Sequence, residues 1–362
     1  MSKVLRRRQP LTIDQVREIS GRLGVPLHLL RFGHRGDDDP TKRRDFGKAV
    51  ALAALTVAPI PKRAEADETT APTLTAITGA QRRLEATTPA RELARGAVAH
   101  VEMANRTLGR AARSTHATDI CAAVSEAAGF AAWLHADMHD AGTARTYYRL
   151  AIDTARRAEH HLLASYMIGS LASFEIEADD AALGLALLSE AARQLGDRPP
   201  ATARAWLSSI EALGHATARN APAALTALRE AEKAVTASER AAAPPWPWVF
   251  PFDHAKLAGY RALVMVRLER PEEAVSAFGE SLASTQPAVK QRGVLMTEVA
   301  AAKSMAGEID EAFHLASDAL AVGVNYASDR VIHRVRRFRR SYTGPVTHAV
   351  RTFDDRLRAT LL

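Results

Sequence analysis

The sequence contains few of the residues from which several common kinds of protein are built. It has one cysteine, Cys121, in 362 residues, which excludes a disulfide framework within the chain. Aromatic residues make up only 6%, and alternating runs of β-branched residues, the usual sign of strands, are nearly absent. Alanine-rich segments dominate instead, and they favour helices almost throughout. We therefore predict an all-α protein that is too long for one compact core.

The sequence also lacks the motifs of common catalytic sites. It has no glycine-rich phosphate loop, no G-x-S-x-G elbow, no Cys-x-x-Cys pair and no paired-carboxylate constellation of a catalytic site. His135 and His139 are four residues apart on an expected helix, a spacing that can hold a metal ion, but no convincing third ligand accompanies them. We expect packing or surface histidines here, a buried inert thiol at Cys121, and a protein without enzymatic activity, cofactor or bound metal.

Charge is unevenly distributed along the chain. The net charge is +7, with twelve Lys/Arg against six Asp/Glu in residues 1–48 and nine against two in residues 330–362. The remaining middle is mildly acidic, with 27 against 33. Basic ends suit a protein that contacts phosphates there, although arginine-rich helix ends can equally serve solubility.

Residues 11–33, LTIDQVREISGRLGVPLHLLRFG, predict two helices. Thr12 can cap a helix in which Val16, Ile19 and Leu23 share one face, and Gly24 ends it. Pro26 then opens a short second helix that carries Leu29 and Leu30. This run resembles the fourth and fifth helices of the helix-turn-helix domains of the xenobiotic-response-element type, found in actinobacterial regulators. The resemblance rests on Asp14, Val16, Arg17, Ile19, Leu23, Gly24, Val25, Pro26, Leu29 and Leu30.

The resemblance implies a cytoplasmic regulator with C-terminal tetratricopeptide repeats, truncated at its N-terminus. Members of this class sense a peptide, small molecule or partner protein with the repeats and usually form homodimers. The helices that read DNA would precede Met1, so DNA binding is expected only with an upstream or partner helix-turn-helix. Arg6, Arg7 and Arg8 are then the candidates for contacts with DNA phosphates.

Residues 41–66 support a different interpretation. Arg43, Arg44, Phe46 and Lys48 resemble the twin-arginine export motif, Ala49–Ala58 form a short apolar core, and Ala64–Ala66 resemble a cleavage site. Ten helical residues span about 15 Å, half of a bilayer core, so a stable membrane anchor is not expected. Because about forty residues precede this motif, we favour an internal linker, with an exported scaffold protein as the alternative.

From about residue 74 the sequence predicts helix pairs. The second helix of each pair repeats Ala-x-x-x-(large or Ala)-x-x-(Ala or Ser), which places small residues on one face, as in tetratricopeptide repeats. The instances are Ala144/Tyr148/Ala151, Ala182/Ala186/Ser189, Ala224/Leu228/Ala231, Ala274/Phe278/Ser281 and Ala312/Ala316/Ala319. Their first residues are 38, 42, 50 and 38 positions apart, so longer helices or loops than the ideal repeat are expected.

These patterns divide the chain into four parts. We expect a partial helix-turn-helix domain at 1–33, a linker at 34–72, a tetratricopeptide-like array at 73–327 and basic capping helices at 328–362. Within the array, Trp246, Trp248 and Tyr260 are the candidate ligand or partner residues, although packing between helices explains the two tryptophans better. The arginines of the final helix pair fall on more than one helix face, so some of them must be exposed. They can contact DNA phosphates or an acidic partner, and a solvated capping helix explains them equally well. They are Arg334, Arg336, Arg337, Arg339 and Arg340.

Overall fold

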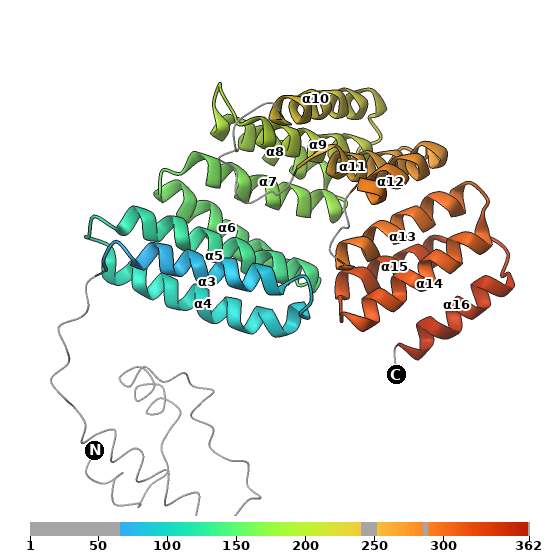
Figure 1. Ribbon diagram of the computed structural model, residues 1–362, viewed down its shortest axis with the longest axis horizontal. Helices are drawn as coiled ribbons and strands as arrows, with labels where there is room; N and C mark the ends of the chain where they lie inside the picture. The colour runs from blue at the N-terminus through green and yellow to red at the C-terminus, as the bar shows by residue number, and fades with distance from the viewer. Residues whose placement is uncertain (1–65, 240–251, 285–288, 361–362) are drawn as a thin grey trace, which may run out of the picture. The chain divides into compact units, whose positions relative to one another are not determined.

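The computed structural model describes residues 66–239, 252–284 and 289–360, and every regular element in these ranges is an α-helix (Figure 1). The expected all-α class is therefore confirmed for this part of the chain. By its contacts the chain divides into two units, residues 1–64 and 65–362. Everything below concerns the second unit. The helix-turn-helix motif at 11–33 and the twin-arginine-like motif lie outside the described residues.

The described residues form fourteen helices. Their bounds are α3 Thr70–Leu84, α4 Ala90–Ala111, α5 Ala117–Asp137, α6 Ala141–Arg157, α7 His161–Glu177, α8 Ala181–Leu195, α9 Ala201–Thr217, α10 Ala221–Glu239, α11 His254–Arg267, α12 Pro271–Ser284, α13 Val289–Met305, α14 Ile309–Asn325, α15 Asp329–Ser341 and α16 His348–Ala359.

The helices from α5 to α14 pack as five antiparallel pairs, each joined by a short turn (Figure 1). The first helices are α5, α7, α9, α11 and α13, and each contacts the first helix of the next pair. Each second helix packs on its own partner and on the first helix that follows it. Burial of the helices between their neighbours stabilises them, because helices of this length are marginal alone in water.

Small residues on the second helices permit this close packing. In α6, Ala144 and Ala151 are fully buried, and the corresponding residues of α10, α12 and α14 are buried as predicted. The prediction was wrong for α8, where Ala182, Ala186 and Ser189 are all exposed. The buried set there is Gly184, Leu188 and Ala191. Gly184 takes the place of the first alanine of the pattern, so the buried set of α8 lies two residues after the predicted set.

The turns between the helices of a pair share one backbone geometry. One residue in each turn has a left-handed φ, and the next N–H bonds to a carbonyl five residues earlier, as Asp180 N does to Glu175 O at 2.9 Å. This is the Schellman end of a helix. The left-handed residues are His139 (φ 60°), Asp179 (67°), Arg219 (60°), Glu269 (59°) and Gly307 (85°). Because all the first helices run in the same direction, these turns lie along one edge of the array.

The last four helices, α13 to α16, share a core of their own. Phe313 of α14 is fully buried and packs against Phe338 of α15 and Phe353 of α16, with ring centroids 5.1 and 5.4 Å away. The final helices are thus not a detached cap. They are packed into the array, and this packing fixes the position of α15.

Candidate functional site

α15 has one apolar stripe and an unusually large number of arginines. Its sequence is DRVIHRVRRFRRS, and Val331, Val335 and Phe338 are its buried residues. The spacing of four and three residues keeps this stripe on one helix face. The remaining faces must therefore hold arginines, and sequence alone does not say what those arginines contact.

Three of these arginines pair with acidic residues from earlier in the chain: one at the end of α5, one at the end of α7, one in the turn after α7 and one within α13. We call this set the α15 seam; it consists of Arg330, Arg334 and Arg337 with Asp137, Glu177, Asp179 and Glu298. Arg330 and Arg334 are largely buried, with side chains only 12% and 16% exposed. Arg340 is exposed, as expected.

The first end of the α15 seam is buried. Arg330 Nε lies 3.0 Å from Asp137 Oδ1, and its guanidinium lies over the Trp133 ring, 4.8 Å from the centroid. Burial raises the pKa of Asp137, and the charge of Arg330 offsets only part of this effect. Burial favours the protonated form of Asp137, and the charge of Arg330 acts in the opposite direction, favouring the carboxylate.

The middle of the α15 seam is a bridge through Arg334. This guanidinium donates to Glu298 Oε1 at 2.5 Å and to Glu177 Oε2 at 2.7 Å. Burial acts to raise the pKa of Glu298, but Arg267 and Arg334 outweigh it and the net shift is downward. Glu298 is therefore a buried, charged group held by two arginines, and it links α7, α11, α13 and α15.

Two further contacts connect the C-terminal helices to the beginning of the array. Arg91 Nε of α4 donates to Asp329 Oδ2 at 2.8 Å. Lys290 of α13 is buried, and its Nζ donates to the Thr88 carbonyl at 2.6 Å and lies 3.6 Å from Glu85 Oε1. Polar contacts between residues about 200 positions apart thus join the two ends of the described unit.

The last end of the α15 seam is open to solvent. Arg337 Nη2 donates to both carboxylate oxygens of Asp179, at 3.0 and 3.2 Å, and the two side chains are 47% and 60% exposed. Arg219 and Glu269 form a similar pair at 2.6 Å, with 68% and 63% exposure. Exposed pairs of this kind contribute about 0–1 kcal/mol each, so exchange of partners costs little.

A pocket of about 590 Å³ lies beside these exposed pairs, and we call it the turn pocket. It is formed where α9, α11, α13 and α15 end, together with Asp179 from the turn after α7. Its charged lining residues are Arg219, Arg267, Arg337, Asp179 and Glu269. Its apolar lining residues are Ala216, Val266, Ala301, Met305 and Phe338. The volume is within the range of small-molecule sites, and the lining combines an apolar wall with a larger number of charged and hydroxyl-bearing side chains.

Two histidines meet next to the α15 seam. The rings of His139, from the turn after α5, and His333, on α15, have centroids 3.9 Å apart. Burial lowers the pKa of both histidines, and nearby arginines lower that of His333 further. His135, the other member of the spaced pair in the sequence, instead lies 3.2 Å from Asp140 and stacks on Tyr147. The two histidines of that pair therefore have different neighbours.

Of the candidate ligand residues, the structure describes Tyr260. It lies on α11 beside Phe252, with ring centroids 5.9 Å apart, and hydrogen-bonds to Trp206. Burial raises its pKa. Trp206 itself packs against Tyr166 at 5.3 Å. Tyr260 is thus part of an aromatic cluster between first helices and does not line the turn pocket.

The other sequence-predicted site residues lie outside the described residues. They are Arg6, Arg7, Arg8, Arg43, Arg44, Phe46, Lys48, Trp246 and Trp248. Sequence reasoning also missed the residues that line the turn pocket. The signal that could have found them is the position just after each first helix, where Asp179, Arg219 and Glu269 stand at equivalent places in their turns.

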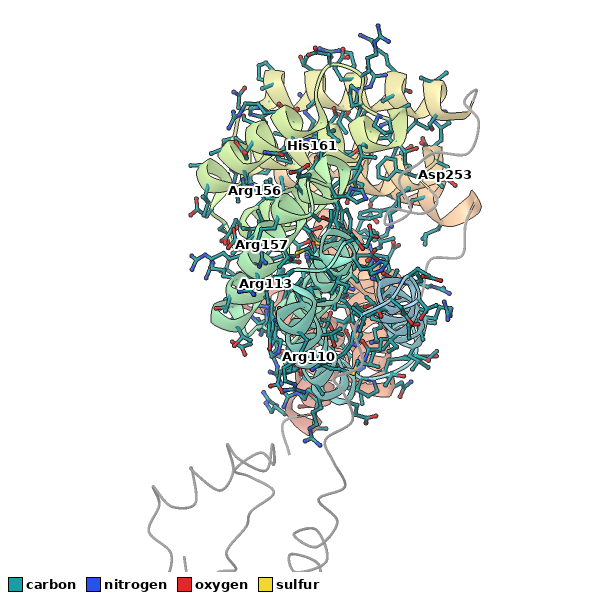
Figure 2. The ribbon with its side chains drawn as sticks, turned by 90° about the vertical axis from the view of Figure 1, so that its left-hand side faces the viewer. Arg110, Arg113, Arg156, Arg157, His161 and Asp253 are labelled. Atoms are coloured by element: carbon teal, nitrogen blue, oxygen red, sulfur yellow. The ribbon has the colours of Figure 1, made fainter. Side chains whose placement is uncertain are left out.

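A second group of basic residues lies on a different edge. In Figure 2 the labels of Arg156, Arg157, Arg113 and Arg110 follow one another down the view, and all four side chains are exposed. Arg110, Arg156 and Arg157 stand in the last turns of α4 and α6. Cations stabilise the negative end of a helix dipole at this position, which accounts for these residues without a ligand.

Cys121 is buried, as expected, and burial raises the pKa of its thiol. In the described ranges, no three His, Cys, Asp or Glu side chains are grouped closely enough to hold a metal ion. No helix within those ranges has the length and apolar character needed to cross a membrane. Comparisons of the chain with protein-family models, with curated proteins and with solved structures gave no match.

Proposed function

We propose that this protein is a ligand-binding helical-repeat protein of the transcriptional-regulator type, and that the turn pocket is its ligand site. The observation that carries the proposal is the pocket of about 590 Å³ built from the ends of four helices. The repeat is tetratricopeptide-like, since buried small residues recur at equivalent places on the second helices. The ligand is a small molecule, a peptide or a segment of a partner protein.

The pocket is well placed to transmit ligand occupancy. Arg337 and Phe338 line it, and both belong to α15, whose other side chains hold the ends of α5 and α7. A ligand that contacts α15 together with the ends of α9, α11 and α13 stabilises their packing against one another. In the proposed regulator, this stabilisation sets the spacing of DNA-binding heads in a homodimer through residues 11–33, with an upstream or partner helix-turn-helix supplying the DNA contacts.

A bulky side chain in the pocket tests the ligand site. Ser304 lines the turn pocket, whereas Ser189 is exposed on α8 and is a matched control. We expect Ser304→Trp to abolish binding of compounds found in a fragment screen by saturation-transfer NMR, and Ser189→Trp to leave it intact. The proposal fails if no fragment that binds the wild type is lost in Ser304→Trp.

A separate measurement distinguishes the regulator from the exported scaffold that residues 41–66 suggest. The native protein is isolated from cytoplasm and culture fluid, and its N-terminus is determined by intact mass and sequencing. A cytoplasmic species of this length or longer supports the regulator. A secreted species that begins near Asp67 supports export and removes any regulatory role for residues 1–66.

A further inference from the structure

We infer that the turn pocket takes an amphipathic carboxylate, whose carboxyl group replaces Asp179 as the partner of Arg337 while its apolar part lies against Val266, Met305 and Phe338. This inference rests on the proposed function, because it names the chemical class of ligand for the same pocket.

The lining of the turn pocket is charged. Three arginines and two carboxylates line the pocket, so its side chains carry one net positive charge. Arginine presents two parallel N–H groups that match a carboxylate, and such pairs are among the strongest hydrogen-bonded contacts in proteins. A ligand carboxylate that takes the place of Asp179 on Arg337 therefore keeps a charge-assisted pair on that arginine.

The arginines of the lining differ in how easily they can exchange their acidic partners. Arg267 is held by buried Glu298 at 3.5 Å, and its side chain is 24% exposed, so it forms a fixed part of the wall. Arg337 is more exposed, and its partner Asp179 is 60% exposed. A solvated acidic partner can move back into water when another carboxylate arrives, whereas removal of a buried partner leaves an uncompensated charge. Arg219 is exposed too, at 68%, but its Nη1 donates to the Arg267 carbonyl at 3.4 Å as well as to Glu269 at 2.6 Å. Of the three arginines in the lining, Arg337 is therefore the one that can exchange its partner without loss of a backbone contact.

The helix ends around the turn pocket favour a ligand that replaces Asp179 over one that binds beside it. The C-terminal ends of α9, α11 and α13 reach the pocket, and each carries the negative end of a helix dipole. An additional anion that left Asp179 in place would meet this negative potential. A carboxylate that exchanges with Asp179 keeps the charge around Arg337 unchanged.

The turn pocket also has an apolar wall. Met305 remains 44% exposed although it lines the pocket, whereas Val266 and Phe338 in the same lining are 8% and 5% exposed. Covering exposed apolar surface is favourable by about 25 cal/mol per Å². A ligand with both an apolar chain and a carboxylate therefore matches the lining better than a small inorganic anion does.

The test is calorimetric titration with octanoate, and with octylammonium as the probe of equal length and opposite charge. We expect octanoate to bind, octylammonium to bind at least about tenfold more weakly, and Arg337→Gln to weaken octanoate about tenfold, the effect of one lost charge-assisted pair. Asp179→Asn should tighten octanoate binding, because it removes the competing carboxylate. Arg340→Gln, an exposed arginine on the same helix outside the pocket, should leave binding unchanged.

Each other outcome overturns the inference in a recognisable way. Equal or tighter binding of octylammonium, or equal effects of Arg337→Gln and Arg340→Gln, contradicts the carboxylate assignment but leaves the pocket as a ligand site. Octanoate binding that survives Ser304→Trp shows that octanoate binds elsewhere. Failure of octanoate to bind, while fragments are still lost in Ser304→Trp, rejects the ligand class and retains the proposed function.

Discussion

Arg334 of α15 and Glu298 of α13 form a buried ion pair, with Nη1 and Oε1 2.5 Å apart and side-chain exposures of 16% and 9%. The second nitrogen of the same guanidinium reaches Glu177 of α7, 157 residues away along the chain. This pair connects the C-terminal core to the middle of the array, and so it fixes where α15 and the turn pocket lie.

Glu298→Gln should lower the free energy of unfolding by about 3 kcal/mol, because it leaves Arg334 and Arg267 without a buried counter-charge. Urea unfolding followed by circular dichroism measures the change. Glu269→Gln is the control, since Glu269 and Arg219 are more than 60% exposed and should cost less than about 1 kcal/mol. Equal effects of the two variants would show that the α15 seam does not hold the array together.

Lys290→Met tests the contact between the two ends of the unit. The Lys290 side chain is 2% exposed and donates to the Thr88 carbonyl. Its loss leaves that carbonyl unpaired, which should cost about 2 kcal/mol. Lys233→Met removes an exposed pair with Glu230, and there we expect less than about 0.5 kcal/mol. The same chemical denaturation experiment compares both variants, and a Lys290→Met value as small as that of Lys233→Met would contradict the prediction.

The histidine pair predicts how stability depends on pH. Burial lowers the pKa of His139 and of His333 below the ordinary value of 6.5. The neutral pair thus contributes stability above pH 6.5 that is lost as the pH falls through the lower folded-state pKa values. His333→Gln should make the loss of stability between pH 7 and pH 5 smaller than in the wild type.

The control for this prediction is His161→Gln, because His161 is also exposed but stands at the start of α7 and is not part of the His139–His333 pair. Urea unfolding of all three proteins at pH 7, 6 and 5 gives the comparison. If the wild type and His333→Gln lose stability equally over this range, the pair has no part in acid sensitivity.

Gly184→Ala tests the corrected register of α8. A Cβ at Gly184 would lie 2.4 Å from Ile176 Cγ1 and 3.1 Å from the Ala172 carbonyl oxygen. We expect a loss of about 1–3 kcal/mol from overpacking. Gly279→Ala on α12 has open space around the added methyl group and should instead gain about 1 kcal/mol, because alanine favours the helix. Thermal unfolding separates the two signs, and stabilisation by both variants would contradict the packing.

Local sequence patterns predicted the helices well. In residues 328–362, where a final pair of helices is expected, the structure has Asp329–Ser341 and His348–Ala359. Four of the five predicted small-residue sets are buried as expected, because the spacing on a single helix decides which residues share a face. The fifth failed because Gly184 fills a position where the pattern required alanine.

The site itself could not be predicted in this way. The partners of Arg330 and Arg334 lie between 36 and 193 residues away in the sequence, and no local pattern selects one exposed acid over another. The turn pocket depends on where five separate segments end relative to one another. The sequence does contain charged residues at equivalent positions in the turns. That they line one pocket becomes clear only from the packing of the helix pairs.

A crystal structure of the protein grown with octanoate tests directly whether the turn pocket is the ligand site. We predict octanoate in the turn pocket, with its carboxylate within hydrogen-bonding distance of Arg337 and with Asp179 turned away from that guanidinium. Octanoate bound only at another place, or a turn pocket without octanoate in a protein that binds it in solution, would contradict the assignment of this pocket as the ligand site.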